Sequence, residues 1–341
     1  MPNDGCRRDD AESGWVVWGR RCAWVAVWGI SLASGGGSGQ PALPDTGVTG
    51  APEEAGRPIA GLEVPRRVSE VWKRFSALPL WEDGLSEMCY YDARCEMYGK
   101  ERRFMRVHLM NRQFLDERRW IKADDTTTYK VPVFKLVISE EVPTENYNYR
   151  YLTVVFQERP SLEPLEVTVS SQEWCGTSFK QLQWSRFQEV APEGWSLDML
   201  SFSYFPGEGD VWKPLPAGVD AYEGLFLFAR AVAASGCESR PMRLLPTLRT
   251  NRGADAHPVD AVLRCEGGPR EISIPLGKVR AQRVVVDWEG AETWFDVGTD
   301  APHVLAAFRA GDVQAELRFT ERRAYWDRAW TSGFHKPGEA P

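Results

Sequence analysis

The fold of this chain is decided by the stretch Leu165-Glu166-Val167-Thr168-Val169-Ser170-Ser171-Gln172-Glu173-Trp174-Cys175-Gly176-Thr177-Ser178-Phe179-Lys180. Its first residues alternate apolar and polar side chains, which is typical of a strand with one buried face. A large aromatic residue, a thiol and a glycine then follow one another, and a second strand is expected over 178–189. The stretch therefore predicts a hairpin with Trp174-Cys175-Gly176 at its turn.

The same two-residue period continues on both sides of this hairpin. Tyr98-Gly99-Lys100-Glu101 is expected to form another turn. Glycines recur at short intervals, and no internal repeat or alternation of helices with strands is visible, which argues against a parallel nucleotide-binding sheet. Further strands are expected over 85–97, 103–115, 129–139, 149–157, 162–171, 197–205, 242–250, 259–265, 270–275, 281–288, 292–297, 303–309 and 313–325. We therefore predict a mainly β protein with a strongly curved antiparallel sheet, an open barrel or sandwich-like.

Two segments have helical spacing instead. Val68, Val71, Trp72 and Phe75 lie on one side of a helix over 66–78, which Pro79 ends. The second helix is expected over 220–234, before Gly236. Its expected apolar stripe consists of Tyr222, Leu225, Phe226, Ala229, Val232 and Ala233. Both are interpreted as accessory helices.

Composition limits the partners. The chain has 341 residues, 43% hydrophobic and 26% charged, and a formal net charge of -7. It has no basic stripe that could neutralise phosphates, so nucleic acid is not an expected partner. The sequence also lacks a Cys-x-x-Cys pair or a cluster of Cys and His, so we expect no metal site and no cofactor.

The N-terminal region predicts export. Arg20-Arg21 precedes an apolar run over 22–33, and small residues follow, as in a secretory signal. We divide the chain into a signal-like segment (1–39), a disordered linker (40–64), a single β-rich domain (65–328) and a flexible tail (329–341). The expected location is the periplasm or cell envelope, with membrane contact only through the N-terminal segment. The oligomeric state, the start codon and the cleavage site are left open.

The cysteines fit such a compartment. Removal of the N-terminal segment leaves an odd number of them, so at least one thiol is unpaired. Cys89 and Cys95 lie six residues apart on one expected strand, too far for a mutual disulfide. Cys237 and Cys265 are the favoured pair.

Two stretches resemble known families. The segment from Trp81 to Lys100, together with Gln172-Glu173-Trp174-Cys175-Gly176, resembles a family of exported bacterial β-rich proteins of uncharacterised function. Its members are sometimes labelled septum formation inhibitor Maf, but Maf pyrophosphatases are α/β proteins with a phosphate-binding element that has no counterpart here. The region 283–319 is similar in layout to periplasmic proteins of the DUF3108 type, which implies a curved sheet around an apolar groove.

Three functions remain open. The first is binding of an apolar or amphipathic envelope ligand, such as a lipid, in the groove of the curved sheet; Tyr147 is among the aromatic residues that could line it. The candidate lining residues chosen for this function are Trp174, Tyr149, Tyr151 and Phe156. The second is a hydrolase or transferase with Cys175 as nucleophile, His303 as base and Glu173 as orienting group, although a thiol beside a tryptophan is also a common packing residue. The third is a structural envelope protein that pairs with a partner through its sheet edges.

Overall fold

The computed structural model of the chain describes residues 70–326, apart from 118, 185–196, 217 and 254. The expected signal-like segment, linker and tail lie outside these residues, as do 66–69 of the first helix and 185–189 of the strand after the Trp-Cys-Gly turn. Within the described ranges, no helix is both long enough and apolar enough to span a membrane.

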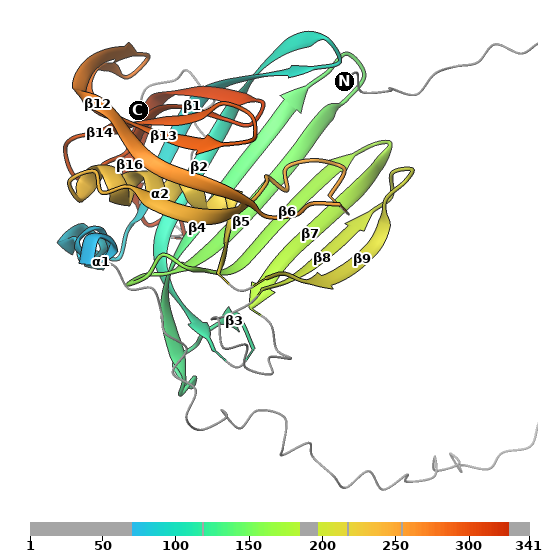
Figure 1. The fold of residues 1–341 in the computed structure, drawn as a ribbon, viewed down its shortest axis with the longest axis horizontal. Helices are drawn as coiled ribbons and strands as arrows, with labels where there is room; N and C mark the ends of the chain where they lie inside the picture. The colour runs from blue at the N-terminus through green and yellow to red at the C-terminus, as the bar shows by residue number, and fades with distance from the viewer. Residues whose placement is uncertain (1–69, 118, 185–196, 217, 254, 327–341) are drawn as a thin grey trace, which may run out of the picture. The chain divides into compact units, whose positions relative to one another are not determined.

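Most of the described chain belongs to one curved, unclosed sheet (Figure 1), which confirms the predicted fold class. The helical elements are α1 (Glu70–Ser76), η1 (Pro79–Glu82), η2 (Tyr222–Gly224) and α2 (Leu225–Ala234). The strands are β1 (Ser86–Met97), β2 (Lys100–Asp116), β3 (Ile121–Lys122), β4 (Lys130–Pro143), β5 (Asn148–Glu158), β6 (Pro164–Glu173), β7 (Gly176–Trp184), β8 (Leu197–Ser203), β9 (Gly209–Pro214), β10 (Val219–Ala221), β11 (Arg240–Leu245), β12 (Val259–Ile274), β13 (Gly277–Trp288), β14 (Thr293–Gly298), β15 (Leu305–Ala310) and β16 (Val313–Arg323).

The sheet is two meanders joined side by side. Its order is β10-β11-β12-β13-β14-β15-β16-β1-β2-β4-β5-β6-β7-β8-β9, with β3 attached to β2. Neighbours pair antiparallel except β10 and β11, which are parallel. The join is the pairing of β16 with β1, in which Ser86 lies opposite Arg323.

The connection between the two end strands explains the curvature. β9 and β10 lie at opposite ends of the sheet order, yet only residues 215–218 connect them. At 3.8 Å per Cα step, Pro214 and Val219 can be at most about 19 Å apart. Fifteen strands spaced about 4.8 Å apart in a flat sheet would separate its ends by roughly 67 Å. The sheet must therefore curl back on itself, and β10 indeed lies against β6.

Helix α2 occupies the middle of the concave side of this sheet. All residues from Leu225 to Val232 are buried, as expected for a helix that is apolar almost all round. The helix packs against β12, β13 and β14. Phe226 packs edge-on against His108, Phe295 and Phe308 at ring-centroid distances of 5.1, 5.5 and 5.4 Å. The predicted helix is confirmed over 225–234, whereas the expected first residues 220–224 belong to β10 and η2. Its burial on all sides exceeds the single stripe expected from the sequence, because the sheet and α1 together surround it.

One buried ion pair ties α2 to β1. Arg230 donates to the two carboxylate oxygens of Glu87 at 2.7 and 2.9 Å. It also donates to the carbonyl oxygens of Pro302 and His303 at 2.8 and 2.9 Å. The side chains of Arg230 and Glu87 are 5% and 3% exposed, so the pair lies inside the protein.

The cysteines of the described chain follow the predicted pattern. Cys237 and Cys265 form a disulfide with their Cα atoms 5.4 Å apart. Cys89 and Cys95 are both free and buried on β1. Burial is the main reason that the pKa of Cys89 rises to about 12 and that of Cys95 to about 11.

Two strand predictions need correction. The expected strand over 242–250 ends at Leu245, and the chain continues as an irregular segment. Residues 249–253 of that segment, here called the strap, lie along the concave face, because their polar groups bond to residues of β4, β6, β7 and β8. Regions 259–265 and 270–275 form the single strand β12, whose pairing with β13 shifts register between Glu266 and Arg270.

Candidate ligand-binding site

The Trp-Cys-Gly stretch forms the predicted hairpin turn. Glu173 at the end of β6 pairs with Gly176 at the start of β7, so Trp174 and Cys175 form the tip. A methyl group at position 176 would overlap the ring of Tyr204, so a larger residue there would require this exposed ring to move.

Trp174 is the outermost member of a stack of four aromatic rings. It stacks on Tyr147 at a centroid distance of 5.5 Å and an interplanar angle of 19°. Tyr147 stacks on Tyr149 at 5.6 Å, and Tyr149 stacks on Tyr151 at 6.4 Å. The guanidinium of Arg249 lies 4.3 Å from the Tyr151 ring centroid and so supports the inner end of the stack. Trp174 is 84% exposed, so an indole held on one face by Tyr147 presents its other face to solvent.

Hydrogen bonds hold the stack in position. The hydroxyl of Tyr147 lies 2.7 Å from the thiol of Cys175 and donates to Glu173 at 3.3 Å. The other carboxylate oxygen of Glu173 accepts from Asn251 of the strap at 2.7 Å. The bond to Cys175, followed by burial, raises the pKa of Tyr147 to about 12. The phenol is therefore neutral at physiological pH and acts as a hydrogen-bonding group.

A hollow of about 540 Å³ lies beside Trp174, within the 300–1,000 Å³ range of small-molecule sites. Its lining residues are Tyr147, Asn148, Arg150, Gln172, Glu173, Trp174 and Thr177. Arg150, Gln172 and Thr177 face one another across β5, β6 and β7, because Arg150 pairs with Gln172 and Gln172 with Thr177. By strand alternation these three side chains lie on the face of the sheet opposite Tyr149 and Tyr151, so the hollow, here called the Trp174 hollow, joins this polar row to Trp174 and Tyr147 at the end of the strands.

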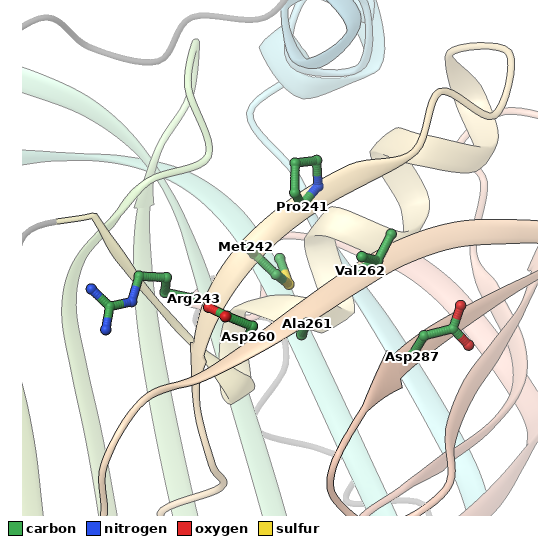
Figure 2. Close-up of a pocket in the computed structure, with 7 residues that line it drawn as sticks. All are labelled: Pro241, Met242, Arg243, Asp260, Ala261, Val262 and Asp287. Atoms are coloured by element: carbon green, nitrogen blue, oxygen red, sulfur yellow. The ribbon is translucent and has the colours of Figure 1, made fainter.

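A second hollow of about 400 Å³ lies over β11, β12 and β13. It is lined by Pro241, Met242, Arg243, Asp260, Ala261, Val262 and Asp287 (Figure 2). Three of these side chains are charged: Figure 2 shows Arg243 near Asp260 at one end and Asp287 at the opposite end, so the three do not converge on one point. Asp287 is also bound to Arg264 at 2.5 Å. We therefore treat the Trp174 hollow as the candidate site.

The structure brings together three of the four chosen lining residues. Trp174, Tyr149 and Tyr151 belong to the same stack, and Tyr147 connects them. Phe156 does not join them, because side chains alternate along β5 and its even-numbered positions face away from the odd-numbered tyrosines. Phe156 instead packs against a separate cluster that contains Leu115, Val131, Val133 and Leu165. The two-residue spacing from 147 to 151 was the sequence signal that could have added Tyr147 to the chosen set.

Cys175 and His303 have different surroundings. The ring of His303 contacts the carbonyl of Gly298 at 3.1 Å, between β14 and β15. Cys175 is exposed at the β6–β7 turn and has a phenol as its hydrogen-bond partner. Glu173 is close to Cys175 but is bonded to Tyr147 and Asn251. The geometry of the described residues therefore gives the thiol no imidazole base. No cluster of three or more potential metal-binding side chains occurs in this part of the chain.

A polar cluster lies beneath the strap, and no pattern in the sequence predicts it. Lys180, the last residue of the opening stretch, is fully buried and donates to the carbonyl of Thr250 and, at 3.3 Å, to Ser178. Ser178 bonds to Ser171 at 2.9 Å, and Ser171 donates to Asn251 at 2.6 Å. Burial lowers the pKa of Lys180 to about 8. The cluster connects the strap to β6 and β7, directly behind the Trp174 hollow.

Comparisons with known proteins add a likeness of fold. No family model matches the chain, and no curated protein matches it. The chain is similar to a solved structure from Brucella abortus, described as a β-barrel-like protein of domain of unknown function DUF1849, with a TM-score of 0.42 and 9% sequence identity. The match covers 70% of this chain and 97% of that chain. The resemblances stated from sequence motifs therefore remain predictions.

Proposed function

We propose that this chain is an exported cell-envelope protein that binds an amphipathic ligand in the Trp174 hollow. The observation that carries the proposal is an 84% exposed tryptophan that stacks on Tyr147 at the end of a row of tyrosines. A large exposed aromatic side chain loses contact with water when a ligand covers it, and stacking on Tyr147 limits the rotamer freedom that it loses on binding. The hollow lies at the β6–β7 turn and not in the groove of the curved sheet that the sequence led us to expect, where the buried helix α2 packs against β12, β13 and β14.

The proposed location rests on two features. The apolar run over 22–33 has the layout of a secretory signal. The Cys237–Cys265 disulfide is of the kind that persists in oxidising compartments. Cell fractionation of the tagged full chain should recover it in the envelope or periplasmic fraction, and recovery in the cytoplasmic fraction alone would contradict this part of the proposal.

The binding function is tested with two defined amphiphiles, octyl glucoside below its micellar concentration and a lysophospholipid. The readout is the indole N–H signal of Trp174 in an ¹⁵N NMR spectrum, assigned by its absence from the Trp174→Ala variant. At least one amphiphile should shift this signal in a saturable manner. Because the Trp174→Ala variant lacks the signal, its affinity is measured by isothermal titration calorimetry, which should show at least tenfold weaker binding than the wild type.

Trp212→Ala is the matched control, because Trp212 is an exposed tryptophan on β9 outside the lining of the hollow. This variant should bind like the wild type. If neither amphiphile shifts the Trp174 signal, or if both substitutions weaken binding equally, the proposed site is wrong.

A further inference from the structure

We propose that the ligand of the Trp174 hollow is an uncharged carbohydrate, whose sugar ring stacks on the free face of the Trp174 indole. This inference rests on the proposed function and names the chemical class of its ligand. A pyranose ring has one or two faces made largely of C–H groups and an edge made of hydroxyl groups. The hollow offers a matching arrangement of one flat apolar surface and one polar row.

The aromatic wall suits a flat ring better than an acyl chain. Tyr147 covers one face of Trp174, so the hollow offers a single planar surface. The other aromatic rings of the stack lie behind Tyr147, and Tyr149 and Tyr151 are buried. An acyl chain gains binding energy from burial of its whole apolar surface, roughly 25 cal/mol per Å². On this site most of such a chain would stay in water, whereas one face of a sugar ring would be covered completely.

The polar row suits hydroxyl groups. Arg150, Gln172 and Thr177 lie on three adjacent strands, and all three are exposed. At about 4.8 Å between strands, the row is roughly 10 Å long, which is comparable with a disaccharide. Within the described part of the chain, the side chains of Gln172 and Thr177 make no protein hydrogen bond. An amide and a hydroxyl can both donate and accept, as sugar hydroxyls require.

The charges around the hollow are already paired, which favours an uncharged ligand. Arg150 bonds to Glu141 at 3.3 Å, and Asn148 donates to the same carboxylate at 2.9 Å. Both carboxylate oxygens of Glu173 are occupied, by Tyr147 and by Asn251. Within the described lining, each charged side chain therefore already has a partner of opposite charge or a hydrogen-bond donor, so none is left over to select a charged ligand, whereas a neutral polyol needs no such charge.

The test uses sugars without an alkyl chain. The full chain is applied to an array of neutral oligosaccharides built from glucose, galactose, mannose and N-acetylglucosamine, and each hit is titrated in solution while the Trp174 indole N–H signal is recorded. We expect at least one neutral glycan to bind and to shift this signal. By isothermal titration calorimetry, Trp174→Ala and Gln172→Ala should each bind that glycan at least tenfold more weakly than the wild type, and Trp212→Ala should bind it like the wild type.

The outcomes separate this inference from the proposed function. If no neutral glycan binds but the lysophospholipid binds with dependence on Trp174, the ligand is not a carbohydrate and the amphiphile-binding function stands. If acidic glycans alone bind, the inference of an uncharged ligand is overturned. If neither sugars nor amphiphiles shift the Trp174 signal, both proposals fail. Circular dichroism of each variant checks that it is folded, which is expected because both Trp174 and Gln172 are exposed.

Discussion

Substituting Glu87 with Gln should destabilise the protein strongly, because it leaves the guanidinium of Arg230 charged and buried. In the wild type, Arg230 makes two hydrogen bonds to Glu87, and its side chain is 5% exposed. Removing one charge of a buried pair typically costs about 3–5 kcal/mol. Relaxation is restricted, since the remaining donors already bond to the carbonyls of Pro302 and His303.

The assay is urea unfolding followed by circular dichroism, with the free energy extrapolated to water. Asp92→Asn is the matched control on the same strand, because Asp92 pairs with Arg318 at 2.7 Å in a setting where the side chains are 37% and 49% exposed. Exposed pairs contribute about 0–1 kcal/mol, so this variant should unfold almost like the wild type.

The double variant Glu87→Gln/Arg230→Met completes the test. Replacing both charges removes the unpaired cation, so the double variant should recover a large part of the stability lost in Glu87→Gln. If Glu87→Gln costs no more than Asp92→Asn, Arg230 must reach solvent. In that case α2 is not enclosed by the sheet as described, and the reasoning on the core is refuted.

Three further predictions concern ionisation and thiols. Because the pKa of buried Lys180 is lowered to about 8 from 10.5, the folded state releases this proton before the unfolded state does, and the free energy of unfolding should rise by about 1 kcal/mol between pH 7.5 and 9. Lys180→Met should remove that rise in urea titrations at each pH, and an unchanged slope would contradict the burial of the ammonium group. Reduction of Cys237–Cys265, which are separated by 28 residues, should cost about 3.5 kcal/mol in the same unfolding assay, and an equal stability with and without reductant would count against the disulfide. Iodoacetamide should alkylate exposed Cys175 at least tenfold faster than buried Cys89, as measured by peptide mass spectrometry; equal rates would contradict the described burial.

Strands and turns could be predicted from the sequence because their signals are local. The alternation through Leu165, Val167 and Val169 predicts which face of β6 is buried, and all three side chains are buried. The turn at Tyr98-Gly99 lies between β1 and β2, and both residues have positive φ values of 55° and 67°. Each of these features depends on a few consecutive residues.

The enclosure of α2, the strap and the aromatic stack could not be predicted, because they depend on contacts between segments that are far apart in the sequence. The sequence of α2 shows an apolar helix but not that a sheet surrounds it, because the strands that cover it come from both halves of the chain. The sequence does not reveal the strap, because its bonding partners on the sheet are distant along the chain: Ser203 lies 48 residues from Asn251, and Lys180 lies 70 residues from Thr250. The stack at Trp174 likewise joins two hairpins, and only one of them contains the Trp-Cys-Gly motif.

The pairing of β16 with β1 has a consequence for biogenesis. During synthesis, β1 emerges more than two hundred residues before β16, one of its two neighbours in the sheet. The paired residues Cys89 and Thr320 are 231 positions apart. Until translation is nearly finished, one edge of β1 has no strand beside it, and an incomplete chain offers that edge to other polypeptides. Loss of β16 alone would therefore leave an edge of β1 without a partner in the middle of the strand order.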